Sequence, residues 1–171
     1  MLVILDILWR KQPESWNRDM NYHLEQAGVQ DLELAAPLFN DYRVFYGQQP
    51  DLAGAHQFLE ARMDNKESVL FIAVTGEGAY RQAGGFAQLY TSFSSVTMQR
   101  VWILNDLFVA AEQRGKGLGS LLLTGVREFA RNTGAKGLEL TTMTNNTGAQ
   151  RLYEAHGYSR EDEFFSYHLF F

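Results

Sequence analysis

The strongest hydrophobic pattern in the sequence is an apolar run that leads through a glycine-rich loop into an amphipathic segment. The run over 104–109 is rich in aliphatic and aromatic side chains and predicts a strand. After the loop, apolar side chains recur at helical spacing at Leu118, Leu122, Val126 and Phe129. This spacing predicts a helix with one apolar face. Thr133-Gly134 ends that helix, because glycine suits the left-handed cap.

Upstream of this unit, the pattern predicts a short strand, two helices and two longer strands. The short strand spans 22–26, and the helices run from Asp31 to Gly47 and from Pro50-Asp51 to Asp64-Asn65. Pro37 falls inside the first helix and is expected to kink or shorten it. In the second helix, four apolar residues share one face: Leu52, Ala55, Leu59 and Met63. The strands span 69–75 and 80–93, with a turn at 76–78 and a bulge or close backbone approach at Gly84-Gly85.

The remaining pattern completes a mixed α/β order. The central strand covers 100–109, and the segment after the amphipathic helix predicts a short strand over 138–142. A further helix runs from Asn145 or Asn146 to Gly157, and a final strand covers 164–171. Antiparallel hairpins come first and a parallel strand–helix–strand crossing comes late. We therefore expect one α/β domain with a mixed central sheet flanked by helices.

The loop between the central strand and the amphipathic helix has the chemistry of a phosphate site. Glycines alternate at 115, 117 and 119, so backbone N–H groups are free of neighbouring side chains. These groups lie at a helix N-terminus, where the helix dipole is positive. Arg114 and Lys116 add charge. The loop therefore predicts a site for a phosphate or pyrophosphate group.

Two well-known phosphate-binding loops do not match. A P-loop needs Ser or Thr directly after Gly-Lys, whereas Lys116 is followed by Gly117. A Rossmann fingerprint that starts at Gly115 has Ser120 in its sixth place, where glycine or alanine belongs. Glu139 lies roughly 20 residues further on, where a ribose-binding acid would be. The loop nevertheless follows several antiparallel strands, which is the wrong context for a dinucleotide fold.

A third loop type fits, and a second motif supports it. The segment 113–119, Gln-Arg-Gly-Lys-Gly-Leu-Gly, resembles the Gln/Arg-x-x-Gly-x-Gly/Ala signature of the GNAT family of acyl-CoA-dependent N-acetyltransferases. The segment 146–158 is similar to the Asn-x-x-Ala-x-x-Leu-Tyr-Glu-x-x-Gly-Phe/Tyr segment of the same family. The resemblance covers roughly residues 20 to 171. Among bacterial subgroups, the chain most resembles Hpa2-like acetyltransferases of histones and polyamines.

This resemblance implies acetyl-CoA as co-substrate and assigns residues to it. The pantetheine arm would pair with main-chain groups along Leu107-Phe108-Val109, whose side chains can still pack in the core. The pyrophosphate would bind the loop and the start of the helix, at Arg114, Gly115, Lys116, Gly117, Leu118, Gly119 and Ser120. Asn146 would bind the pantetheine arm, although a helix cap explains it equally well. Tyr153 would be the catalytic group that protonates the departing thiolate, since a phenol is a donor at neutral pH; the alternative is a core tyrosine.

The resemblance also indicates where the acceptor amine would bind. Substrate recognition would come from the first two helices, where Tyr42, Phe45 and Tyr46 could form an aromatic wall for a cation or merely pack on the sheet. Asp106 matches the family aspartate. Many polyamine-acetylating relatives carry Glu directly before it, whereas this chain has Asn105, which is no base. The general base is therefore open, and a non-catalytic acyl-CoA-binding sensor is the alternative function.

Composition adds limits to these expectations. A length of 171 residues, of which 46% are hydrophobic, suits one domain, which we place at 20–171, with 1–19 as an extension outside it. The net charge of −5 disfavours nucleic acid and weakly favours a cationic substrate. The chain has no cysteine, which excludes thiol nucleophiles and thiolate metal sites, and its four histidines lack ligand spacing, so no metal site is expected.

The two ends of the chain indicate location and assembly. The apolar stretch 1–9 is too short to span a bilayer and lacks the features of a secretory signal, so we expect a cytoplasmic protein without a membrane partner. The final segment holds too many apolar side chains for a free tail: Phe164, Phe165, Leu169, Phe170 and Phe171. The resemblance to the GNAT family also implies a homodimer, since members of that family often pair through their C-terminal strands or outer helices.

Overall fold

The computed structural model describes residues 22–171, so the predicted extension at 1–19 lies outside the described residues. The chain forms two compact units, of which the first ends at Leu140 and the second is Thr141–Phe171. The first unit holds the sheet and three of the α-helices, and the second holds the remaining one. Each unit is described below by itself.

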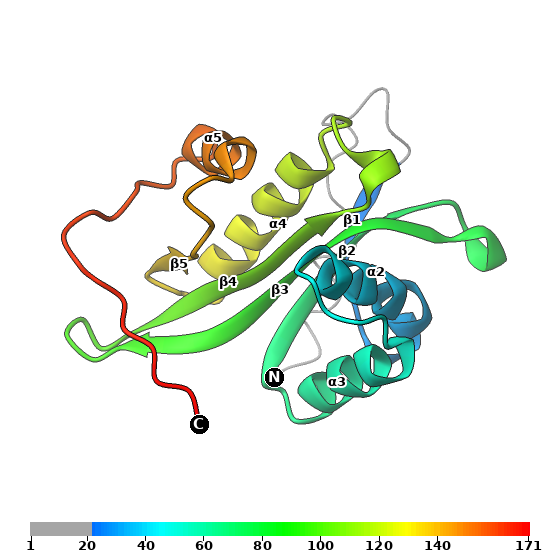
Figure 1. The fold of residues 1–171 in the computed structure, drawn as a ribbon, viewed down its shortest axis with the longest axis horizontal. Coiled ribbons are helices and arrows are strands. Elements are labelled where there is room, and N and C mark those ends of the chain that lie inside the picture. The colour runs from blue at the N-terminus through cyan, green and yellow to red at the C-terminus, as the bar shows by residue number, and fades with distance from the viewer. Residues whose placement is uncertain (1–21) are drawn as a thin grey trace. The chain divides into compact units, whose positions relative to one another are not determined.

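The first unit is built on a five-stranded sheet whose strand order follows the sequence, β1-β2-β3-β4-β5. The strands are β1 (His23–Gln26), β2 (Ser68–Thr75), β3 (Gln82–Ser94), β4 (Gln99–Val109) and β5 (Gly137–Glu139). The first four pair antiparallel, and β5 pairs parallel with β4. This mixed order confirms the predicted fold class (Figure 1).

Helices cover both faces of this sheet (Figure 1). On one face lie α2 (Leu32–Phe45) and α3 (Leu52–Asp64), which pack on the side chains of β2, β3 and β4 in a common core. On the other face lies α4 (Leu118–Asn132), where Phe129 packs against Phe71 and Trp102 with ring centroids 5.2 Å apart in both pairs. Short 3-10 turns complete the unit at Val29–Asp31, Gly78–Tyr80 and Ala111–Gln113.

Local sequence signals explain most of the element boundaries. The Asp51 carboxylate accepts the Gly54 N–H at 2.8 Å and caps the start of α3. Gly134 follows the end of α4 in the left-handed region, at φ +68°, as predicted. The pair Gly84-Gly85 forms both the bulge and the close backbone approach that were expected there. Gly84 is the extra residue of a bulge opposite Ala73 and Val74. A Cβ on Gly85 would lie 2.7 Å from the Phe108 carbonyl oxygen, so the two backbones approach closely at this residue.

Pro37 lies inside α2 and does not cut it short, because the helix continues to Phe45; of the two effects expected of this proline, the kink stays a prediction. The buried face of α2 consists of Leu32, Ala35, Ala36, Leu38 and Phe39. Leu52 is the first residue of α3 and remains half exposed. Ala55 and Leu59 are buried as expected.

In the second unit, α5 (Thr147–Ala155) forms as predicted, and Gly157 follows it at φ +86°. The predicted final strand over 164–171 was wrong, because this segment is irregular and exposed throughout. A strand needs a neighbouring strand to satisfy its backbone, and the second unit contains no other strand. In the first unit, the short strand expected over 138–142 is also shorter than predicted. The observed strand is β5, Gly137–Glu139, and its three residues are those that pair with β4.

Candidate active site

The central strand β4 loses its parallel neighbour halfway along. Only Val101, Trp102 and Ile103 pair with β5, whose last residue, Glu139, lies opposite Ile103. From Leu104 to Val109, β4 still pairs with β3 on one side, but no described strand pairs with it on the other. The strand therefore presents an open edge just before the glycine loop.

A β-bulge lies where this edge opens. Leu89 is opposite Leu104 and Gln88 is opposite Asp106, so Asn105 is an extra residue in β4. A bulge bends its strand and increases its twist. The bulge at Asn105 lies just beyond Ile103, the last residue of β4 that pairs with β5.

The strand register determines which main-chain groups face the open edge. Ala110 N donates to Gly84 O at 3.0 Å, which places Ala110 on the side bonded to β3. In an antiparallel pair this role alternates, so Phe108 also bonds to β3, whereas Leu107 and Val109 direct their N–H and C=O groups away. Accordingly, the Val109 carbonyl accepts a hydrogen bond at 3.1 Å from Arg114 Nε rather than from β3. Of the three residues predicted to pair with a pantetheine arm, Leu107 and Val109 face the open edge, whereas the main chain of Phe108 faces β3.

The glycine loop leads from this edge to the N-terminus of α4. Gly115 and Gly117 adopt φ +74° and +82°, and Gly117 is the N-cap, without a side chain to cap the helix. Leu118 is buried and anchors the first turn against the sheet. The loop is exposed, and Lys116 Nζ donates to Gln113 Oε1 at 3.0 Å. The first turn of α4 therefore presents backbone N–H groups that have no acceptor within the helix, and the phosphate site expected there stays a prediction.

Arg114 connects this loop to the end of α2. Its guanidinium lies 5.7 Å from the ring centroids of both Phe45 and Phe108. Phe45 is 59% exposed, so it forms a surface wall beside the loop rather than a part of the core. The structure thus brings together Phe45, predicted for the amine, and Arg114, predicted for the cofactor.

The other predicted aromatic residues form one cluster with the sheet. The Tyr42 ring contacts Phe86 at 5.7 Å, Phe108 at 6.0 Å and Tyr46 at 5.0 Å. Tyr46 is half exposed, whereas Tyr42 is packed against the core. Of the two interpretations of these aromatic residues, packing on the sheet therefore applies in part to Tyr42. Phe45 and Tyr46 are exposed and accessible to a ligand.

Asp106 is a buried carboxylate on the face covered by α2 and α3. Its side chain is 5% exposed and accepts hydrogen bonds from Asn105 Nδ2, at 3.0 Å, and from Tyr42. Burial raises the pKa of Asp106 above its usual value, and these two hydrogen bonds oppose the rise. A basic carboxylate in an aromatic setting is suited to accept a proton or to hold an ammonium group.

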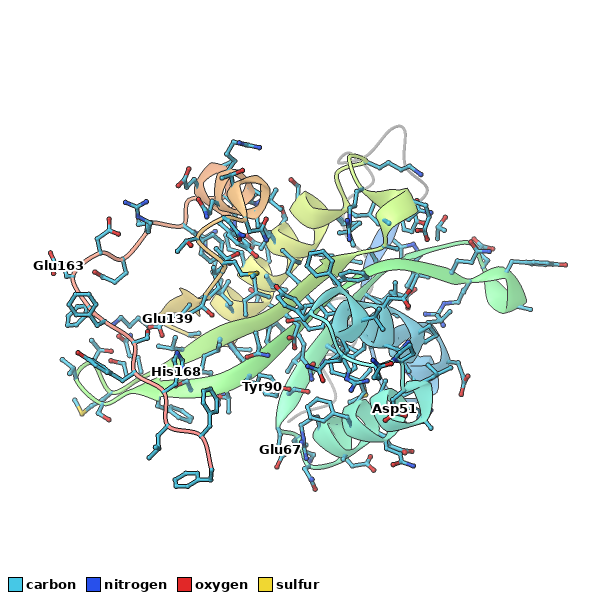
Figure 2. All side chains as sticks on the ribbon, viewed as in Figure 1. Asp51, Glu67, Tyr90, Glu139, Glu163 and His168 are labelled. Carbon is cyan, nitrogen blue, oxygen red and sulfur yellow. The ribbon has the colours of Figure 1, made fainter. Side chains whose placement is uncertain are left out.

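Asp106 belongs to a polar band that sequence reasoning largely missed. Gln88 is fully buried beside it, and its Nε2 donates to Ser68 Oγ at 2.9 Å. Tyr90 lies two residues along β3 on the same face, where burial first, and then the charge of Asp106, raises its pKa to about 12. Figure 2 labels Tyr90 on the part of the sheet near Glu67, whose charge also raises this pKa. The signal that could have revealed this polar band in the sequence is Gln88, a glutamine within the otherwise apolar middle of the strand β3.

The second unit holds the two remaining predicted residues. Asn146 Oδ1 accepts a hydrogen bond from the Ala149 N–H at 3.2 Å and caps the start of α5. The structure thus shows Asn146 as a helix cap, which was one of its two expected roles. Tyr153 is partly buried in α5, with its ring 5.8 Å from that of Tyr158. Their proposed contacts with a cofactor remain predictions.

Comparison with known proteins identifies the family. A model described as "Acetyltransferase (GNAT) family" matches residues 1–158. The chain belongs to the GNAT family. The GNAT enzyme is 47% identical over 148 residues to "Uncharacterized N-acetyltransferase YhfO" of Bacillus subtilis, a match that covers 86% of this chain and 96% of that protein. Its fold matches the crystal structure of a probable acetyltransferase with a TM-score of 0.81 and 40% identity, over 87% of this chain and 97% of the other.

A mammalian relative matches over a shorter stretch. This is the thialysine N-epsilon-acetyltransferase of Bos taurus, 33% identical over 86 residues that make up half of each chain. The enzyme is thus an N-acetyltransferase, and its family uses acetyl-CoA generally. Within residues 22–171, no helix is long and apolar enough to cross a membrane. The same residues contain no cluster of three or more His, Asp or Glu side chains that could hold a metal ion.

Proposed function

We propose that this enzyme transfers an acetyl group from acetyl-CoA to a primary amine, in a direct ternary complex. The observation that carries the proposal is the open edge of β4, where main-chain groups of Leu107 and Val109 face outward just before the glycine loop. An arm with amide groups can pair with such an edge as an added strand would. The residues present fit acetyl-CoA, because a pantetheine edge and an anion site follow one another along the chain.

The loop and the first turn of α4 hold the pyrophosphate in this proposal. Their N–H groups and the positive helix end bind its oxygens, and Arg114 and Lys116 supply charge. The Asn146 side chain, which caps α5, would add a contact to the pantetheine arm. When bound, acetyl-CoA supplies the activated acetyl thioester.

The transfer needs two proton movements, and the chain offers a group for each. The amine nitrogen forms a bond to the thioester carbonyl carbon, and the carbon–sulfur bond breaks. Tyr153 gives its hydroxyl proton to the departing sulfur, and an outward N–H of β4 stabilises the negative carbonyl oxygen. The nitrogen loses its extra proton to Asp106 or to water. With no cysteine in the chain, no thiol can form an acyl-enzyme.

The acceptor is best described as a small cationic amine, a polyamine or a lysine side chain. Three features support this class: the net charge of −5, the buried Asp106 and the exposed rings of Phe45 and Tyr46. The name of the bovine relative specifies N-epsilon-acetylation of thialysine, which is consistent with an amine acceptor. We also propose that the enzyme acts in the cytoplasm as a homodimer.

The decisive experiment has two arms. Isothermal titration against acetyl-CoA, CoA and NAD should give binding of the first two and none of NAD. Turnover is then measured with a panel of polyamines, lysine-containing peptides, amino acids and small amines. Acetyl-CoA binding without turnover of any amine would favour the alternative, a non-catalytic acyl-CoA sensor. Absence of acetyl-CoA binding would refute both functions.

A further inference from the structure

The sheet face under α2 and α3 holds a buried acceptor atom that lacks a hydrogen-bond partner. Gln88 is fully buried, and while its Nε2 donates to Ser68 Oγ, its Oε1 accepts no hydrogen bond from any described residue. Native proteins rarely leave a buried acceptor unpaired, because the lost hydrogen bonds to water are not replaced. The partner of such an atom is expected to lie outside the protein itself, in an ordered water or in a ligand atom that replaces it.

Gln88 lies directly opposite Asp106 in the register of β3 and β4. Residues opposite one another share a face of the sheet, and their Cβ atoms are about 4.5–5.5 Å apart. Asp106 accepts from Asn105 and Tyr42, but a carboxylate has about four acceptor positions. The glutamine oxygen and the carboxylate thus belong to residues that lie directly opposite one another on the same face of the sheet.

The surroundings favour a donor that carries N–H groups. Phe86 and Phe108 form the neighbouring opposite pair on this face, and the Tyr42 ring contacts both. Among residues 22–171, no lysine or arginine forms a salt bridge with Asp106. The two acceptors therefore lie near aromatic rings, and no described lysine or arginine neutralises the carboxylate. Such surroundings are suited to bind the amino group of a ligand.

We propose that Gln88 Oε1 and the Asp106 carboxylate together hold the two N–H groups of a primary acceptor amine, and so select primary over N-methylated amines. This assignment rests on the proposed acetyl transfer. A neutral primary amine has two hydrogens and one lone pair. When both hydrogens are held, the lone pair points to the remaining side, where it can attack. An N-methyl amine has one hydrogen and leaves one buried acceptor unpaired.

The test compares a primary amine with its N-methyl derivative in the wild-type enzyme and in Gln88→Met. Methionine has a similar length and no strong acceptor. The wild type should prefer the primary amine by about 10–100-fold in kcat/KM, the effect of one buried hydrogen bond. In Gln88→Met this preference should largely disappear, because kcat/KM falls for the primary amine and changes little for its N-methyl derivative.

Controls separate this role from a structural one. Gln82→Met, at the exposed end of the same strand, should leave both kcat/KM values unchanged. Acetyl-CoA affinity should be the same in all three proteins. The Tm of Gln88→Met should change little, because the variant removes an unpaired buried acceptor together with the hydrogen bond from Gln88 Nε2 to Ser68 Oγ, and the two effects on stability oppose one another. If it does fall, Gln88→Leu takes its place in the same comparison.

The outcomes distinguish the two proposals. A wild-type enzyme that acetylates primary amines, with a preference that persists in folded Gln88→Met, would overturn the role of Gln88 and leave the proposed function intact. A wild-type enzyme that prefers N-methylated amines would overturn it as well. Absence of turnover with every amine, despite acetyl-CoA binding, would overturn the proposed function and this assignment with it.

Discussion

At the scale of single residues, the first unit holds a buried acid and the second unit holds a phenol, and a separate role is proposed for each. Asp106 is held by Tyr42 and Asn105 beneath α2, whereas Tyr153 lies in α5. The first residue would serve the incoming amine and the second the departing thiolate. Substitutions that keep shape but remove one proton-transfer group can test each role alone.

Tyr153→Phe keeps the ring and its packing against Tyr158 and removes only the hydroxyl. If this hydroxyl protonates the thiolate, kcat should fall by about 10²–10⁴, the usual contribution of a general acid. KM for acetyl-CoA should change little, because the lost interaction belongs to the transition state. Steady-state kinetics with a good amine measure both. An undiminished kcat would leave solvent as the proton donor.

Asp106→Asn should change the pH dependence of stability. Burial raises the pKa of Asp106 in the folded protein, so the fold favours the protonated acid. The resulting stability is present at low pH and is lost as pH rises through the folded-state pKa, at about 1.4 kcal/mol for each unit of elevation. Asparagine is neutral throughout. The Tm of the variant should therefore rise relative to wild type between acid and neutral pH, while turnover falls.

Thermal unfolding of both proteins across this pH range gives the comparison. Since the other titrating groups are common to the two proteins, the difference in Tm isolates Asp106 and its neighbours Tyr42, Asn105 and Tyr90. A difference that stays constant with pH would contradict the raised pKa.

At the scale of elements, the unit of β4, glycine loop and α4 carries the cofactor proposal. Gly117→Asp puts a carboxylate at the N-cap of α4, where the pyrophosphate is expected, and should abolish acetyl-CoA binding in isothermal titration. Gly134→Asp is the matched control, because Gly134 also has positive φ but follows the other end of α4. Both variants share the backbone strain and the added charge.

Circular dichroism should show a native fold for both glycine variants, and only Gly134→Asp should retain affinity. Equal acetyl-CoA affinity in the two folded variants would place the cofactor elsewhere.

Elements that are determined by nearby residues could be predicted from the sequence, whereas features that depend on strand pairing could not. The loop and α4 were predictable because their glycines and their apolar spacing are local in the sequence. The position of Gln88 opposite Asp106 was not predictable, because it depends on the strand register across the bulge at Asn105. The strand expected over 164–171 failed for a related reason, since alternation of side chains cannot supply a neighbouring strand.

At the scale of the whole molecule, the C-terminal segment bears on assembly. Its large apolar side chains are each more than three-quarters exposed: Phe164, Phe165, Tyr167, Leu169, Phe170 and Phe171. Such a concentration of apolar surface is rare on a monomer. We expect light scattering at micromolar concentration to give the mass of a dimer. The double variant Phe165→Ser, Phe170→Ser should shift the mass towards the monomer, and a monomeric wild type would refute the expectation.

The bulge at Asn105 has a consequence for how this enzyme tolerates mutation. Main-chain groups form the open edge of β4, so substitutions at Leu107 or Val109 leave those groups in place. Loss of residue 105 would keep every side chain on its present face, because Leu104 and Asp106 already face opposite sides. It would nevertheless remove the bend and let β5 pair further along β4. A library of single-codon deletions would therefore reveal a part of the site that an alanine scan passes over.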